Sequence, residues 1–224
     1  MTVVLASASA SRAELLRRSG INPVVMPSDV DEDAVLAATR SSTPHATFEQ
    51  LCVALAEAKG RAIVAELVAS GSEDAGAGPT LVVACDSMFE IHGRLLGKPG
   101  SSEVAQARWE EIRGHTGVLH TGHYVALVPG DGTASSEQQF CASSAVEFAE
   151  VSDEEIRWYV ATGEPLGVAG AFTLEGLAGP FISAVQGCVS NVMGLSLPGF
   201  RNAAAELGVR WLDVVLTPPG GAAG

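Results

Sequence analysis

The feature that most constrains the fold of this chain is the alternation of short apolar segments with segments of helical spacing. Apolar runs of four to eight residues are typical of buried strands, and apolar positions three or four residues apart are typical of helices. The candidate strands are residues 2–6, 22–26, 81–85, a hairpin over 89–96, 117–128, 139–148 and 210–215. The candidate helices are residues 12–19, 48–68, 103–113, 153–162 and 198–207. This order predicts an α/β fold with a mixed sheet.

Composition limits the classes of function. Hydrophobic residues make up 47% of the 224 residues, which is enough for a sizeable core of Ala, Val and Leu. The net charge of −13 argues against a nucleic-acid surface, which needs a basic patch, and against anionic membranes. The four cysteines contain no C-x-x-C pair, so we expect reduced thiols. Without a signal-like start or an apolar run of about 18 residues, the expected location is the cytoplasm.

Positive charge is distributed unusually, since the chain has thirteen basic residues but only two lysines, Lys59 and Lys98. Arginine serves for ordinary solvated charge in this sequence. A lysine supplies a compact ammonium on a flexible stem, which the planar guanidinium of arginine does not mimic. The two lysines are therefore candidates for a site, although the chance survival of two surface lysines explains them equally well.

A serine-rich segment follows the first candidate strand and leads into a helix. Ser7, Ser9 and Arg12 could form a cradle for an anion, because free backbone N–H groups and hydroxyls gather at such a helix start. Ser11 and Glu14 match a capping box, which would start the helix near Arg12. An ordinary capped turn is the alternative.

Two acidic positions are candidates for metal binding or proton transfer. Asp86 stands at the carboxyl end of the strand predicted over 81–85, where open α/β sheets bind their ligands. Glu32 lies in an acidic turn over 29–33. A carboxylate can bind a divalent metal or deprotonate a water, but a turn aspartate and a solvated acidic loop explain the same residues. His115, His120 and His123 are close in sequence, but we do not expect their side chains to converge on a metal.

Several segments together resemble one family, the Maf family of nucleoside triphosphate pyrophosphatases. The similarity runs in register from about residue 3 to residue 210. The matching segments are residues 5–16, 30–32, 58–59, 85–87, 93–99, 112–115, 120–122, 159–165, 169–172 and 191–198. Both lysines fall within these segments.

The resemblance implies a fold and a reaction. The implied fold is an elongated mixed sheet flanked by helices around a deep central cleft, as in Maf and inosine triphosphate pyrophosphatase-like proteins. It would form a single domain with two lobes over residues 1–215, followed by a disordered tail over 216–224. The implied reaction hydrolyses a nucleoside triphosphate between the α- and β-phosphates, with Mg²⁺ or Mn²⁺, to a nucleoside monophosphate and pyrophosphate. A homodimer is compatible with the resemblance.

The resemblance also implies roles for individual residues. Asp86 would be the base that deprotonates the attacking water, and Glu32 and Asp86 would hold the metal. Lys59 and Lys98 would act with Asp86 in catalysis by stabilising phosphate charge. The implied substrate-binding residues are Ser7, Ser9, Arg12, Ser87 and Glu175.

The sequence departs from the family pattern at positions that bear on specificity. Ala10 and Ser11 replace a frequent proline and a second basic residue, Val168 stands where lysine is usual, and Glu175 replaces a frequent glutamine. Ser87 resembles the threonine or serine of family members that act on thymidine and uridine triphosphates. Because of the other departures, canonical pyrimidine nucleotides and modified nucleotides both stay open as substrates. Two other functions also stay open: a non-catalytic nucleotide-binding regulator of septum formation, and a phosphatase or phosphotransferase of another class.

Overall fold

A computed structural model describes residues 1–70, 78–130 and 135–215. The described residues contain a seven-stranded mixed sheet with the strand order β2-β1-β3-β5-β6-β7, and β4 also pairs with β3. This architecture confirms the predicted α/β class. The strands are β1 (Thr2–Leu5), β2 (Val24–Val25), β3 (Thr80–Ile91), β4 (Arg94–Leu96), β5 (Thr116–Val128), β6 (Ser136–Phe148) and β7 (Ile182–Gln186).

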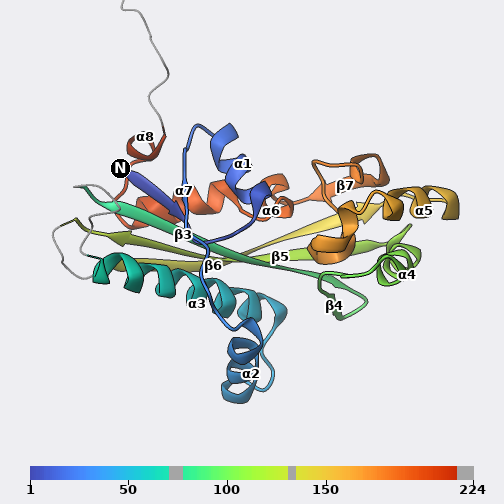
Figure 1. Cartoon of the computed structure of the whole chain (residues 1–224), viewed down its shortest axis with the longest axis horizontal. Helices are drawn as coiled ribbons and strands as arrows, with labels where there is room; N and C mark the ends of the chain where they lie inside the picture. The colour runs from blue at the N-terminus through green and yellow to red at the C-terminus, as the bar shows by residue number, and fades with distance from the viewer. Residues whose placement is uncertain (71–77, 131–134, 216–224) are drawn as a thin grey trace, which may run out of the picture.

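Three long antiparallel strands, β3, β5 and β6, run along most of the molecule (Figure 1). Strand β1 joins them at one end and pairs in parallel with both β2 and β3. Strands β4 and β7 join at the other end, and both pair antiparallel. The parallel and antiparallel parts of the sheet therefore lie at different places along the same long strands.

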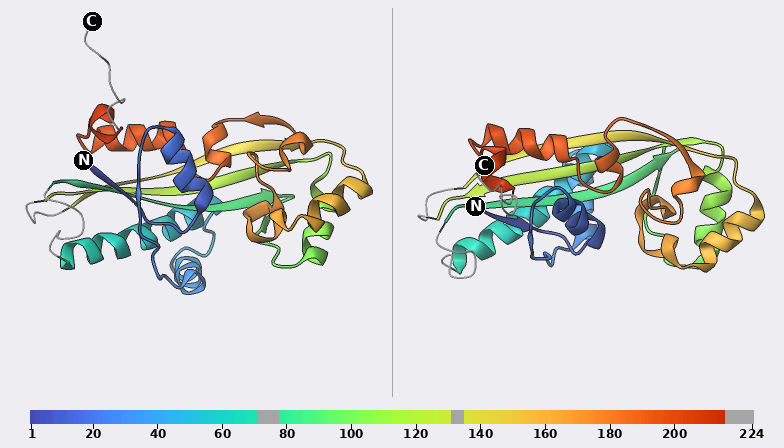
Figure 2. Two further views of the ribbon diagram at one scale, coloured as in Figure 1. Left: turned by 45° about the horizontal axis from the view of Figure 1, so that its top comes forward. Right: turned by 90° about the horizontal axis from the view of Figure 1, so that it is seen from above.

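Helices cover both faces of the sheet (Figure 2). Helix α3 lies on one face, and its buried side chains pack with Val82, Ala84 and Tyr124. Helices α1 and α7 lie on the opposite face and pack on Val83 and Val125. The helices are α1 (Ala10–Arg18), α2 (Glu32–Ser42), α3 (Phe48–Ala69), α4 (Ser102–Ile112), α5 (Asp153–Ala161), α6 (Val189–Val192), α7 (Leu197–Glu206) and α8 (Trp211–Val214).

A separate aromatic core forms at the far end of the sheet, where α4 and α5 meet the ends of the long strands. Trp109, Phe148 and Tyr159 are buried there, and their rings meet edge to face. The Trp109 indole also donates a hydrogen bond of 2.8 Å to the Ala171 carbonyl. This bond ties the irregular segment after α5 to the core.

The long elements agree with the sequence prediction, and several short ones do not. The long helix over 48–68, the strands over 117–128 and 139–148, and the hairpin over 89–96 are confirmed. The last predicted strand, 210–215, was wrong, because residues 211–214 form the short helix α8. Strand β7 was not predicted.

The start of α1 differs from the predicted capping box. The helix begins at Ala10, and the Ser9 hydroxyl caps it by accepting from the Arg12 backbone N–H. Glu14 instead forms ion pairs with Arg17 and Arg18 on the exposed side of the helix. The helix therefore begins two residues earlier than the sequence suggested.

The acidic segment near residue 30 is a helix start rather than a turn. Asp31 caps α2 by accepting from the Ala34 N–H, so Glu32 is the first residue of that helix. Helix α2 has no buried residue, which explains why no apolar periodicity revealed it.

The remaining expectations concern a loop, the tail, the cysteines and membrane spans. A segment without core-forming residues predicts a surface loop over 71–79, of which 71–77 lie outside the described residues, and the tail expected over 216–224 lies wholly outside them. The four cysteines are free thiols, as expected. Within the described ranges, no helix has both the length and the apolar character that a bilayer crossing requires.

Candidate active site

A gap along one edge of β3 forms the base of the candidate site. Strand β1 pairs with β3 only as far as Val83, and β4 begins its pairing at Phe89. Within the described part of the chain, no strand covers this edge of β3 between those two residues. Asp86 and Ser87 lie in the gap. The expectation that the strand ends at Asp86 was therefore wrong, because β3 continues to Ile91 and it is the neighbouring strand that ends.

Consecutive residues of a strand point to opposite faces of the sheet, so the gap presents Asp86 to one face and Ser87 to the other. Asp86 faces helix α3, and Ser87 faces helix α1. A cleft of about 730 Å³ opens at this place. Its lining includes all of the predicted site residues: Ser7, Ser9, Arg12, Glu32, Lys59, Asp86, Ser87, Lys98 and Glu175.

Lys59 of α3 bridges the two acidic residues. Its Nζ lies 2.6 Å from Asp86 Oδ1 and 2.7 Å from Glu32 Oε1. The side chains of Lys59 and Asp86 are only 14% and 13% exposed, whereas Glu32 is 55% exposed. The two carboxylates, which come from α2 and β3, therefore converge on one point at the cleft wall.

Burial and charge act together on this group. Burial is the largest influence on Asp86 and raises the pKa of its carboxyl above the usual value, although Lys59 and Arg12 oppose the shift. Burial alone would lower the pKa of Lys59, but Asp86 and Glu32 together outweigh it and raise that pKa. Lys59 is therefore a permanent cation at neutral pH, and Asp86 is a stronger base than an exposed aspartate.

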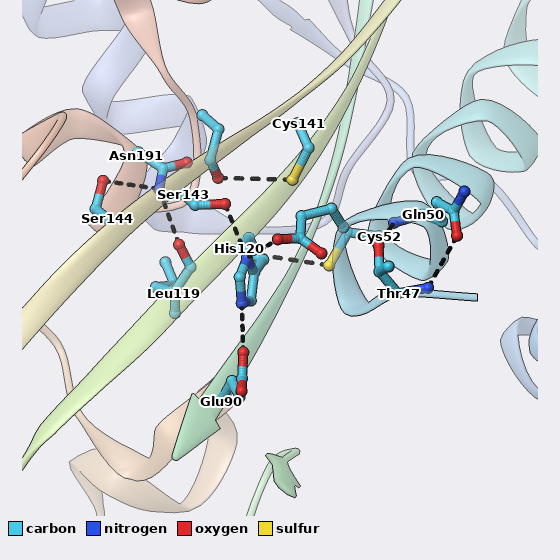
Figure 3. Close-up of polar contacts among 12 residues, drawn as sticks. Thr47, Gln50, Cys52, Glu90, Leu119, His120, Cys141, Ser143, Ser144 and Asn191 are labelled. Carbon is cyan, nitrogen blue, oxygen red and sulfur yellow. Dashed lines mark hydrogen bonds and ion pairs between the residues drawn. The ribbon is translucent and has the colours of Figure 1, made fainter. Parts of the chain in front are cut away.

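The carboxylates fit a divalent cation better than the histidines do. Mg²⁺ commonly binds one or two protein carboxylates together with substrate phosphates and water, and Glu32 and Asp86 supply two converging carboxylates. The histidines are engaged elsewhere. His120 bonds Ser143 and Glu90 (Figure 3), and His123 stacks on Phe140.

Arg12 is held on the opposite side of the β3 gap by three acceptors. Its guanidinium donates to the Gly194 carbonyl at 2.7 Å, to Ser7 Oγ at 3.0 Å and to Ser87 Oγ at 3.0 Å. Ser7 also accepts from the Ser9 N–H, which closes the loop around the start of α1. Ser7, Ser9 and Arg12 therefore lie together at the start of α1, and their binding of an anion stays a prediction.

The remaining predicted residues line the outer part of the cleft. Lys98 follows β4 and is exposed, and Glu175 is exposed on the segment after α5. Glu164 fixes that segment, because its carboxylate accepts from the Tyr159 and Thr173 hydroxyls and from the Leu177 N–H. The segment over 167–175, which includes Val168, therefore forms one wall of the cleft.

Sequence reasoning missed the residues behind Arg12. Thr121 is fully buried next to Ser87, and Gly194 supplies the carbonyl that holds the guanidinium. Gly194 has a positive φ of 100°, and a Cβ there would come within 3.0 Å of Arg12 Nε. Both residues lie in segments that match the family, but nothing in their residue type pointed to Arg12.

The fold and this cleft agree with a family comparison. The family model described as Maf-like protein matches residues 2–207, so the chain belongs to that family. Among its relatives is a nucleoside triphosphate pyrophosphatase of Nocardia farcinica, 45% identical over 93% of both chains. Proteins of the same name from Salinispora tropica and Streptomyces coelicolor are 45% and 46% identical. These alignments cover 92% of this chain and 84% and 90% of theirs.

Proposed function

We propose that this protein is a nucleoside triphosphate pyrophosphatase. The observation that carries the proposal is the convergence of Lys59, Asp86 and Glu32 at one wall of a cleft that also holds Arg12 and Lys98. A buried carboxylate and several cations in one cleft are the groups that hydrolysis of a phosphoanhydride requires. The similarity of the chain to proteins named nucleoside triphosphate pyrophosphatase supports the same function.

The bond to be broken lies between the α- and β-phosphates, which gives a nucleoside monophosphate and pyrophosphate. Asp86 accepts a proton from the attacking water, because its largely buried carboxylate lies at the cleft wall beside the cations that would bind the phosphates. Arg12, Lys59 and Lys98 surround the phosphates with positive charge that offsets the charge developing in the transition state. The Ser7 and Ser9 hydroxyls lie at the same end of the cleft and are suited to donate to phosphate oxygens.

Glu32 and Asp86 are the proposed ligands of a Mg²⁺ or Mn²⁺ ion. When bound, such an ion supplies neutralisation of phosphate charge and a template that orients the triphosphate. Lys59 holds both carboxylates in place.

The nucleoside end of the substrate is assigned to the wall over 167–175. Glu175 can accept hydrogen bonds from a base, but its ionised carboxylate cannot donate one. The substrate class therefore includes bases that present N–H groups to this wall. Both canonical pyrimidine triphosphates and modified triphosphates contain such bases.

The test measures products released from a panel of nucleoside triphosphates with Mg²⁺ or Mn²⁺. We expect pyrophosphate and a nucleoside monophosphate, and we expect Asp86→Asn to lower turnover by roughly 10²-fold or more while the triphosphate still binds. Asp213→Asn, at an exposed carboxylate paired with Arg210, is the matched control and should behave as wild type.

Three results would contradict the proposal. Release of orthophosphate would instead indicate a phosphatase. Nucleotide binding without any release of pyrophosphate would favour the regulator of septum formation. Full turnover in a folded Asp86→Asn protein would remove Asp86 from the mechanism.

A further inference from the structure

A chain of hydrogen bonds runs from Arg12 into the buried core behind the cleft. Arg12 Nη2 lies 3.0 Å from Ser87 Oγ, and Ser87 Oγ lies 2.9 Å from Thr121 Oγ1. Thr121 Oγ1 lies 3.3 Å from the Asn191 carbonyl oxygen. Ser87 and Thr121 are direct partners on the paired strands β3 and β5, so this contact is built into the register of the sheet.

The direction of this chain follows from the chemistry of its ends. The Asn191 carbonyl can only accept, so the single hydroxyl proton of Thr121 is donated to it. Thr121 must then accept from Ser87, whose own proton is used in that bond. Arg12 can only donate, so Ser87 accepts from it. The order is Arg12 to Ser87 to Thr121 to Asn191, with every proton assigned.

The direction of these hydrogen bonds gives different roles to Ser87 and Ser7, two serines that looked alike in the sequence. Ser87 has no proton left for a phosphate oxygen. Ser7 accepts from Arg12 Nη1 and from the Ser9 N–H, which leaves its own proton free to be donated. Ser7 is therefore suited to bind phosphate directly, whereas Ser87 is suited to hold Arg12.

Asn191, at the buried end of this series of hydrogen bonds, is held by several further hydrogen bonds. Asn191 is fully buried, and its amide nitrogen donates to the Leu119 carbonyl and to Ser144 Oγ, both at 3.1 Å (Figure 3). Its backbone carbonyl also accepts from the Gly194 N–H at 2.8 Å. Gly194 in turn supplies the carbonyl that holds Arg12 Nε. Two of the three acceptors of Arg12 therefore depend on the turn at Asn191.

We propose that Thr121 and Asn191 are positioning residues for Arg12. Ser87 has the same positioning role and does not contact the substrate. Three of the five guanidinium N–H groups of Arg12 are used within the protein. These hydrogen bonds fix the plane of the guanidinium, so that one remaining N–H on each Nη is presented to an anion. The identity of that anion as the triphosphate of a nucleotide rests on the proposed function.

The experiment is a double-mutant cycle between Thr121 and Arg12. Binding of inorganic tripolyphosphate is measured by calorimetry, and pyrophosphate release by steady-state kinetics. Thr121→Val keeps the shape and removes the hydroxyl, so the Kd for tripolyphosphate should rise by roughly 5- to 10-fold and kcat/KM should fall by at least the same factor. Thr121→Ser should restore binding. Thr116→Val, on an exposed residue of the same strand, is the matched control.

The cycle distinguishes positioning from general packing. Arg12→Lys keeps the positive charge but loses the forked guanidinium that these hydrogen bonds orient. In that background, Thr121→Val should therefore change the Kd by less than about 2-fold. An equal effect in both backgrounds, or unchanged binding by a folded Thr121→Val protein, would overturn the proposal. If Thr121→Val does not fold, Ser87→Ala removes the hydroxyl that accepts directly from Arg12 Nη2, and the same criteria apply.

Failure of the proposed function is recognised separately. A wild-type protein that releases no pyrophosphate contradicts the pyrophosphatase proposal. The tripolyphosphate cycle still decides whether Thr121 acts through Arg12.

Discussion

Gly122 controls how closely helix α3 approaches the sheet, and its replacement by alanine should disturb the site from a distance. Gly122 pairs with Asp86 across strands β5 and β3, so both residues face α3. A Cβ at Gly122 would lie 2.2 Å from the backbone carbonyl atoms of Cys52 and 2.4 Å from the Val53 nitrogen. These atoms belong to the helix backbone, which cannot rotate away as a side chain can.

The size of the effect follows from these distances. Carbon atoms in good contact are about 3.5 Å apart, so α3 must retreat by roughly 1 Å. Overpacking of this kind costs about 1–3 kcal/mol of unfolding free energy, and we expect the upper part of that range because backbone must move. Lys59 lies two helical turns after Cys52, so its ammonium retreats from Asp86. A displacement near 1 Å can lower turnover by about 10²-fold.

The assay combines urea unfolding with pyrophosphate release. For Gly122→Ala we expect a lower urea midpoint with an unchanged m-value, together with reduced turnover by the folded protein. Gly78→Ala is the control, because a Cβ at Gly78 meets no atom within 4 Å. Wild-type stability and turnover in Gly122→Ala would refute the idea that this contact sets the position of Lys59.

Three further predictions concern single side chains. Lys98→Arg should lower turnover although the charge is kept, because the forked guanidinium is larger, and kinetics on the preferred triphosphate measure this. Glu175→Gln should change the ranking of kcat/KM across a triphosphate panel more than it lowers the best value, since an amide can donate and a carboxylate cannot; an unchanged ranking would contradict this role. Burial lowers the pKa of His123 to about 3, so the ring is neutral in the folded protein while the unfolded chain binds a proton near pH 6.5. Stability should therefore fall as the pH drops below about 6.5, by up to about 1.4 kcal/mol per pH unit, and urea unfolding of His123→Gln should show a flatter profile.

The sequence predicted the parts of this fold that have a strong local period. The long helix α3 shows it, because its apolar positions recur over many turns and Thr47 and Gln50 form a capping box at its start. Helix α2 was missed because none of its residues is buried, and α8 because four residues are too few to show a period.

The candidate site was predicted from residue type and family resemblance, but its geometry was not. Asp86 was assigned to a strand end because polar residues usually follow a buried run. The sheet instead leaves a gap beside a continuous strand, and only the pairing of β1 and β4 reveals it. The link from Arg12 through Ser87 to Thr121 depends on strand register, which no local pattern encodes.

The continuous strands β3, β5 and β6 determine how the cleft can move. They pass from the core packed by α1, α3 and α7 to the aromatic core packed by α4 and α5. The two halves of the molecule are therefore joined by three continuous hydrogen-bonded strands rather than by a linker. We therefore expect the cleft to narrow by twisting of these strands or by displacement of the segments at its rim, rather than by a hinge between two separately folded halves.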